Sequence, residues 1–326
     1  DRARRADEVM AKLARDQGRE GLAVRKWGGG GGVGHRALRA TVGNWPDADL
    51  ICRFAKPVRC SNRADMSKRL TADLASGALT EALADLAEDA ARVILPYWRN
   101  GVTAEAKADD SPVTRADQEA EALILARLAS LYPGVQAVAE EAVAADGVPA
   151  SADDWFWLID PLDGTRGFIE GREAFTVNIA LIHKGSPVAG VVTAPATGTS
   201  WRSGAPGAGA SRRRFGEGWQ AIKVRNRPAS PMAVMSHSMT DVEAERLASR
   251  HGCVQWQGMD SSLKFCLIAE GRFDAYPRTG PTSEWDTAAG QAVLEAAGGR
   301  VMAEDGQPLR YGKPGFGNGG FVALGG

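Results

Sequence analysis

Residues 157–165 read WLIDPLDGT, and this segment constrains the chain more than any other. An apolar run ends in Asp160, a proline forces a turn, and a second carboxylate, Asp163, follows three residues later. A turn this tight can bring both carboxylates and the Leu162 carbonyl to one point. Because carboxylate and carbonyl oxygens are the ligands that Mg²⁺ takes in proteins, the segment predicts a magnesium site.

The same segment continues into Gly164 and Thr165, which are expected to open a helix. The free N–H groups and the positive end of such a helix favour a phosphate. A purely structural interpretation competes with this one, because Asp and Thr are common in Asx-turns and at helix N-caps. Taken alone, the motif leaves both interpretations open.

Three further acidic elements bear on that choice. Glu140 and Glu141 directly follow an apolar strand, where a solvated turn is the structural alternative. Asp286 stands in the first turn of the SEWDTAAG helix, where it would also interact favourably with the helix dipole. Asp117 closes the segment SPVTRAD, whose T-x-x-D pattern is also that of a capping box.

The composition excludes several classes of protein. With 39 basic and 40 acidic residues, the net charge of −1 offers no footprint for a nucleic-acid polymer. No stretch reaches the ~18 apolar residues of a transmembrane span. The four cysteines show no CxxC spacing and there are only four histidines, which disfavours zinc. We therefore expect a cytoplasmic protein with reduced cysteines, in which any metal is a hard cation bound by oxygen.

The N-terminal part of the chain differs from the rest. Residues 1–65 hold 14 Lys or Arg and 8 Asp or Glu, a net charge of +6, and include a run of five glycines, whereas the remainder carries −7. We expect residues 1–65 to be a low-complexity basic extension outside the catalytic fold, which would begin at Met66. The alternative is a basic docking arm, which leaves peripheral association with the inner face of the cell membrane open.

Hydrophobic periodicity predicts the elements of the remaining chain. Helices are expected around 86–97 and at 114–131, 244–251, 261–270 and 285–297. Strands are expected at 135–139, 155–159, 175–182, 188–193, 233–236, 273–276 and 300–303. Residues 201–218 are rich in Gly, Ser and Arg and are expected to form a loop near a subdomain boundary.

In identity, order and spacing, the four acidic elements resemble the inositol monophosphatase superfamily of Mg²⁺-dependent, lithium-sensitive phosphatases. The resemblance runs from Met66 to the C-terminus, and DPLDGT with WDTAAG is a specific pair. Within the superfamily, SPVTRAD, GFIEGREAFTVNIALI, DSSLKFCLIAEGRFDAYPR and GPTSEWDTAAG are most similar to the bacterial 3'(2'),5'-bisphosphate nucleotidases of the CysQ type.

The resemblance implies a fold and a metal site. The fold is α/β, a layered α/β/α/β/α sandwich, with an α+β metal- and phosphate-binding subdomain at 66–198, an α/β substrate-side subdomain at 199–326, and the active site between them. Two or three Mg²⁺ ions are expected on a shared set of ligands: Glu140, Asp160, the Leu162 carbonyl, Asp163, Asp286 and, for the weaker third ion, Asp117. Thr165 and Asp117 would orient the attacking water, and Glu140 belongs to the same catalytic set.

The implied substrate is a small phosphorylated nucleotide, adenosine 3',5'-bisphosphate, cleaved to AMP and phosphate by a monomer or homodimer. The scissile phosphate would lie on the N–H groups of Gly164 and Thr165. Ser262 suits a ribose, and Lys264 and Arg278 suit the second phosphate. Surface positions are the alternatives for both cations. The alternative functions are inositol monophosphatase, another sugar-phosphate phosphatase, and a catalytically silent binding protein of the same fold.

Overall fold

The computed structural model describes residues 63–101, 103–107 and 112–326. The helices are α4 (Arg63–Ser76), α5 (Ala78–Asn100), α6 (Arg115–Leu131), α7 (Glu140–Asp146), α8 (Thr165–Ile169), α9 (Asp241–Arg250), α10 (Leu263–Ala269) and α11 (Ala288–Ala296), with 3₁₀ turns η1 (Glu284–Asp286) and η2 (Pro314–Phe316). The strands are β1 (Ala104–Ala106), β2 (Pro112–Thr114), β3 (Gln136–Ala139), β4 (Trp155–Asp163), β5 (Thr176–His183), β6 (Ser186–Ala194), β7 (Thr199–Ser203), β8 (Ala210–Arg214), β9 (Gln220–Ile222), β10 (Met232–Ser236), β11 (Gln255–Met259), β12 (Ala275–Arg278), β13 (Thr282–Ser283), β14 (Arg300–Ala303), β15 (Gly317–Asn318) and β16 (Phe321–Leu324).

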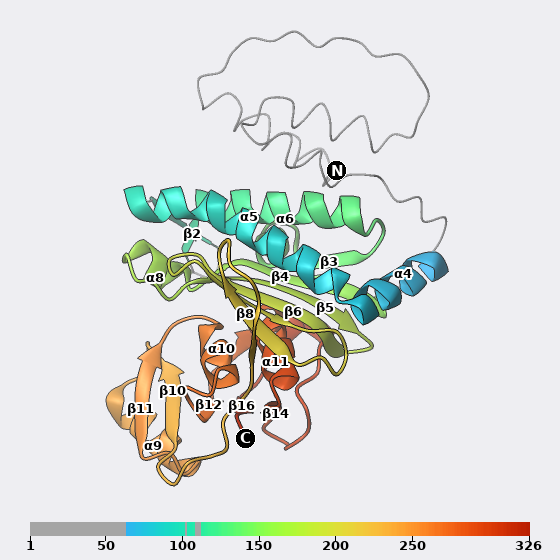
Figure 1. The fold of residues 1–326 in the computed structure, drawn as a ribbon. Coiled ribbons are helices and arrows are strands. Elements are labelled where there is room, and N and C mark those ends of the chain that lie inside the picture. The colour runs from blue at the N-terminus through green and yellow to red at the C-terminus, as the bar shows by residue number, and fades with distance from the viewer. Residues whose placement is uncertain (1–62, 102, 108–111) are drawn as a thin grey trace, which may run out of the picture.

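These elements stack in alternating layers (Figure 1). Helices α5 and α6 cover one face of a seven-stranded sheet, and α11 packs on β5 and β6 from the other face. A second, five-stranded sheet of order β11-β10-β12-β16-β14 contacts α10 and α11, and α9 packs on its strands β10, β11 and β12. The α/β/α/β/α sandwich expected from the sequence is confirmed.

The seven-stranded sheet has the order β3-β4-β5-β6-β7-β8-β9, with β3 and β4 parallel and β4 and β5 antiparallel. Alternate residues of β4 point to opposite faces, as a strand requires. Trp157 and Ile159 join the core beneath α5 and α6, whereas Phe156 and Leu158 join the core around α10 and α11. The apolar run of β4 is continuous because helices cover both faces of the sheet.

The polar hairpin between β7 and β8 corrects the expectation of a loop at 201–218. Strands β7 and β8 pair from Thr199 with Arg214 to Ser203 with Ala210 and extend the first sheet, which continues past residue 198 to β9. The Arg213 guanidinium lies 2.7 Å from Glu88 Oε1 and 2.7 Å from Asp85 Oδ1, both on α5. Arg213, one of the arginines that suggested a loop in the sequence, therefore pairs with acidic side chains on a helix distant in sequence.

The structure describes only the end of the predicted N-terminal extension. Residues 1–62 lie outside the described residues, while 63–65 form the first turn of α4, slightly before the start expected at Met66. Met66 itself is buried in the core with Leu70. Among the helices of the described ranges, none has the length and apolar character needed to cross a membrane.

Helix α11 lies very close to the sheet at Gly190 of β6. A Cβ atom there would lie 2.6 Å from the Ala289 carbonyl oxygen and 2.6 Å from the Ala292 Cβ. Both atoms belong to the α11 backbone or lie next to it, so the clash cannot be relieved by rotating a side chain. Glycine at this position therefore sets the spacing between the sheet and the helix that follows Asp286.

We expect Gly190→Ala to lower the free energy of unfolding by about 1–3 kcal/mol, because overpacking forces backbone shifts. Gly218→Ala is the matched control, since nothing lies within 4 Å of its Cβ position. Urea or thermal unfolding measures both variants. Equal stability of the two variants would contradict the close packing of α11 on β6.

Candidate active site

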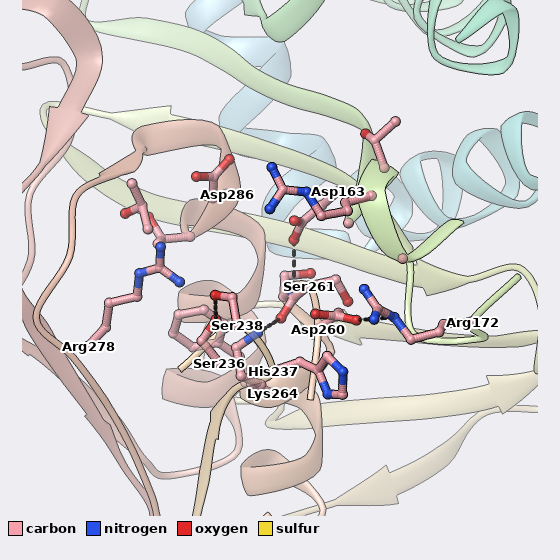
Figure 2. A pocket seen from close by; sticks show the side chains of 18 of the residues that line it. Asp163, Arg172, Ser236, His237, Ser238, Asp260, Ser261, Lys264, Arg278 and Asp286 are labelled. Atoms are coloured by element: carbon pink, nitrogen blue, oxygen red, sulfur yellow. Dashed lines mark hydrogen bonds and ion pairs between the residues drawn. The ribbon is translucent and has the colours of Figure 1, made fainter. Parts of the chain in front are cut away.

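A cavity of about 590 Å³ opens between the two halves of the molecule (Figure 2). Its wall comes from segments far apart in the sequence: the end of β4, helix α8, the end of β10, the start of α10, strand β12 and the turn η1. Figure 2 shows Asp163, Asp286, Arg278 and Lys264 around this cavity, so acidic and basic side chains share its wall. Both halves must therefore be folded for the cavity to exist.

The DPLDGT segment forms a bulge inside β4 rather than the turn expected after a strand at 155–159. Strand β4 continues to Asp163, and its register with β5 shifts between Asp160 and Asp163. The Leu162 N–H donates to Asp160 Oδ1 at 3.0 Å, and the Thr165 hydroxyl donates to the Leu162 carbonyl at 2.9 Å. The bulge thus turns two carboxylates of one strand toward the same region.

The carboxylates of Asp160, Asp163, Asp286 and Glu140 lie within electrostatic range of one another. Burial raises the pKa of Asp160 and of Asp286 well above the usual value, and the neighbouring negative charges raise them further. Burial also raises the pKa of Asp163 to about 6. Like charges held together in this way are stabilised by a proton or a cation.

The donor set fits a hard divalent cation. Its members are carboxylates, with the Leu162 carbonyl beside them, and these are oxygen ligands of the kind that Mg²⁺ takes. Within the described ranges, no three His, Cys, Asp or Glu side chains are already arranged as a finished metal site. The crowded negative charge, rather than a closed ligand cage, is what matches a cation here.

Asp117 combines the two interpretations that its sequence left open. Its Oδ2 atom accepts from the Thr114 N–H at 2.8 Å and from the Thr114 hydroxyl at 2.6 Å, which completes a capping box at the start of α6. Its Oδ1 atom accepts from the Thr165 hydroxyl at 3.1 Å. The cap therefore holds the buried Asp117 carboxylate against the first residue of α8.

Gly164 and Thr165 lie where β4 passes into α8, and both line the cavity. Gly164 has φ 96°, a left-handed conformation, and a Cβ atom there would lie 3.1 Å from the Ala174 carbonyl oxygen. Only glycine combines this backbone angle with that close approach. The backbone of the DGT segment is thus fixed at the cavity wall.

The predicted substrate-side residues also line the cavity. Ser262 donates its N–H to Asp163 Oδ2 at 2.5 Å and its hydroxyl to Asn178 Oδ1 at 2.6 Å. Lys264 is buried, not on a solvated helix face, and its ammonium donates to the Met259 and Ser261 carbonyls at 3.1 and 2.5 Å.

The two cations on this side differ in setting. Burial lowers the pKa of Lys264 to about 8. Arg278 is only partly buried, and its guanidinium lies near the Gly280 and Pro281 carbonyls at 3.4 and 3.2 Å. Both positive charges lie on the cavity wall, and their contact with a phosphate stays a prediction.

Sequence reasoning missed Glu121, a buried carboxylate next to the site. Its two oxygens accept the N–H groups of Glu141 and Ala142 at 2.8 Å each, which anchors the turn that carries Glu140. Burial raises the pKa of Glu121 to about 8. Its position four residues after Asp117, on the apolar face of the helix, was a signal that could have identified it.

Sequence reasoning also missed a lysine on the opposite side of that turn. Lys107 Nζ lies 2.6 Å from Glu140 Oε1 and 2.7 Å from Glu141 Oε1. These ion pairs raise the pKa of Lys107 above its usual value, although burial opposes the shift. In the sequence, Lys107 stands in a polar loop with no feature that links it to Glu140.

Fold and site together define a layered α/β phosphatase that depends on a hard metal. The profile of the inositol monophosphatase family matches residues 77–320, so the chain belongs to that family. The 3'(2'),5'-bisphosphate nucleotidase CysQ of Salmonella typhimurium is 41% identical over 246 residues, which cover 72% of this chain and 94% of that relative. The enzyme of the same name from Escherichia coli K12 is 46% identical over 208 residues, covering 63% and 81%.

Solved structures agree with this assignment. CysQ from Bacteroides thetaiotaomicron, a bacterial member of the inositol monophosphatase family, superposes with a TM-score of 0.62 at 33% identity and covers 76% of this chain and 97% of its own. An inositol monophosphatase from Anabaena gives a TM-score of 0.59 at 29% identity, covering 77% and 91%. The family expected from the sequence motifs is confirmed.

The raised pKa of Glu121 predicts a pH effect on stability. A carboxyl whose pKa is raised in the folded protein from its usual 4.5 to about 8 binds more protons when folded. Its stabilising effect is therefore lost as the pH rises from about 5 to 8. We expect the free energy of unfolding to fall less over this range in Glu121→Gln than in the wild type, measured in chelator-containing buffer. Glu245→Gln, at an exposed site on α9, is the control, and an equal fall in Glu121→Gln and wild type would contradict the assignment.

Proposed function

We propose that this chain is a Mg²⁺-dependent 3'(2'),5'-bisphosphate nucleotidase that hydrolyses adenosine 3',5'-bisphosphate to AMP and phosphate. The observation that carries the proposal is the charge of the cavity wall. Carboxylates from three segments line the cavity, and the cations Lys264 and Arg278 lie in the same wall within electrostatic range of Asp163 and Asp286. A substrate with two phosphates matches this arrangement, and relatives that are 41% and 46% identical carry the nucleotidase name.

The residues that would hold two or three Mg²⁺ ions are those with crowded negative charge: Glu140, Asp160, Asp163, Asp286, the Leu162 carbonyl and, for a further ion, Asp117. When bound, Mg²⁺ supplies neutralisation of the phosphate charge, which matters because phosphoryl transfer depends on positioning and electrostatics. Asp163 is already held by the N–H of Ser262, so one ligand side chain has a fixed orientation.

The proposed roles of Thr165 and Asp117 concern the attacking water. The Thr165 hydroxyl lies between Asp117 Oδ1 and the Leu162 carbonyl, at 3.1 and 2.9 Å. The hydroxyl has a single proton, which these two acceptors share, and its oxygen lone pairs remain available to orient a water beside the phosphate. The N–H groups of Gly164 and Thr165 are proposed to bind the phosphate itself.

Substrate choice is proposed to reside in the second half of the chain, because metal ligands serve any phosphate ester. Ser236 ends β10 at the cavity wall, His237 and Ser238 follow it, and Ser262 is the N-cap of α10 nearby. These hydroxyls suit a ribose, and the buried charge of Lys264 suits the second phosphate. Inositol 1-phosphate lacks that second phosphate, so an inositol monophosphatase would gain little from Lys264.

We expect Asp160→Asn to reduce Mg²⁺-dependent phosphate release by about a thousandfold or more, with Asp286→Asn behaving likewise. Each change is nearly isosteric and removes one negative charge from the cluster that would compensate Mg²⁺. Thermal unfolding confirms that the variants fold, and Thr165→Ala should lose less activity than either. Turnover at the wild-type rate in saturating Mg²⁺ would exclude the proposed ligand assignment.

A substrate panel tests the proposed preference. With Mg²⁺ present, adenosine 3',5'-bisphosphate should be hydrolysed with a higher kcat/KM than inositol 1-phosphate. Without Mg²⁺, neither ester should be hydrolysed. Lys264→Met nearly keeps the side-chain volume in the buried site and removes the charge. It should therefore lower the kcat/KM for the bisphosphate by about tenfold more than the kcat/KM for the monophosphate. If the wild type prefers inositol 1-phosphate, the chain is a phosphatase of another specificity. If no ester in the panel releases phosphate, the chain is a catalytically silent binding protein.

A further inference from the structure

An ion pair crosses one wall of the cavity between two residues to which the proposed chemistry assigns no role, although both stand in segments that carry the family resemblance. Arg172 Nε lies 2.9 Å from Asp260 Oδ2 (Figure 2), and both side chains are partly buried. Arg172 follows α8, whereas Asp260 is the first residue of the turn at 260–262 that connects β11 to α10. The pair therefore joins the proposed phosphate-binding segment to the proposed ribose-binding segment.

Each partner is anchored to the segment it would position. The Arg172 N–H donates to the Gly167 carbonyl at 2.8 Å, which fixes Arg172 at the end of α8. Asp260 precedes Ser261, whose φ of 57° is a left-handed conformation that non-glycine residues rarely adopt. The next residue, Ser262, donates its N–H to Asp163 at 2.5 Å. The position of the strained turn is thus coupled to Asp163.

The pair lies directly over α8. A Cβ atom on Gly167 would lie 2.9 Å from Asp260 Oδ2 and 3.0 Å from Arg172 Nε, so any larger residue displaces one of the partners. The atoms that would move are the ends of side chains rather than backbone. The substitution Gly167→Ala should therefore push the two side chains apart without removing either charge.

Arg172 is poorly suited to bind a phosphate of the substrate. Its guanidinium faces two carboxylates. Asp260 lies beside Nε, and Glu170 Oε2 lies 2.6 Å from Nη1. These negative charges cancel the attraction that a free guanidinium would offer to an anion. The buried Nε atom makes no hydrogen bond, so its contact with Asp260 is an ion pair by proximity. Arg172 therefore connects two segments of the protein and is not placed to bind the substrate.

We propose that Arg172 and Asp260 are positioning residues, forming a clasp that fixes the distance between α8 and the turn at 260–262. This proposal rests on the proposed function, because a nucleoside bisphosphate would contact both segments at once. A small phosphate ester held at α8 and the acidic cluster reaches the turn much less. The clasp therefore contributes to the KM of the larger substrate and to discrimination between the two.

The test measures kcat and KM for adenosine 3',5'-bisphosphate and for p-nitrophenyl phosphate, with saturating Mg²⁺. Asp260→Asn, Arg172→Gln and Gly167→Ala should each raise the KM of the bisphosphate by about 3- to 10-fold. We expect kcat to fall less than threefold and the KM of the small ester to change less than twofold. Arg172→Lys keeps the positive charge and should restore most of the affinity.

Two further comparisons separate a clasp from general stability. The double variant Arg172→Gln with Asp260→Asn should match either single variant, because both remove the same interaction. Asp153→Asn is the matched control: it removes the Arg63–Asp153 ion pair, at 3.4 Å, whose residues do not line the cavity. Its KM values should equal those of the wild type.

The proposal is overturned if the three single variants leave the bisphosphate KM within twofold of the wild type. It is also overturned if both substrates lose affinity equally together with a lower melting temperature, which indicates a structural role. If the wild type does not prefer the bisphosphate, the proposed function fails. In that case the clasp is tested with the large ester that the wild type prefers. The three variants should increase the KM of this ester by a larger factor than the KM of p-nitrophenyl phosphate, and an equal factor for both overturns the proposal.

Discussion

The mutual repulsion of the carboxylates at the end of β4 is the constraint on which the rest of the structure depends. Burial raises the pKa of Asp160, Asp163 and Asp286, and the negative charge of Glu140 raises all three further, as does that of Asp163 for Asp160 and Asp286. Side chains that repel one another must be held by the surrounding chain. The bulge in β4, the capping interaction of Asp286 with Ser283 and the anchoring of the Glu140 turn by Glu121 provide that support.

The layered fold supplies the rigidity that such a site needs. Strand β4 is covered on both faces, and α11, whose first turn follows Asp286, packs against β6 at Gly190. The segments carrying the carboxylates are therefore fixed relative to one another by apolar packing rather than by contacts among the carboxylates. Apolar packing is dense and resists small displacements, so it can hold groups that would otherwise move apart.

A second set of polar contacts connects the acidic side of the cavity to the opposite half of the molecule. Ser262 joins Asp163 to Asn178 of β5, and Lys264 brings a buried positive charge close to Asp163. The Arg172–Asp260 pair joins the same two regions at the wall of the cavity. The turn at 260–262 contacts Asp163 directly, so the proposed substrate-binding and metal-binding residues are in contact.

The sequence by itself determined the family and the acidic residues, because DPLDGT and WDTAAG are local patterns, and the layered fold followed from the resemblance to that family. It did not reveal that 201–218 forms a hairpin, since the partners of Arg213 lie on α5, over a hundred residues away. Nor did it reveal the roles of Glu121, Lys107 or the Arg172–Asp260 pair. Those roles depend on burial and on contacts between distant segments, which only the tertiary structure decides.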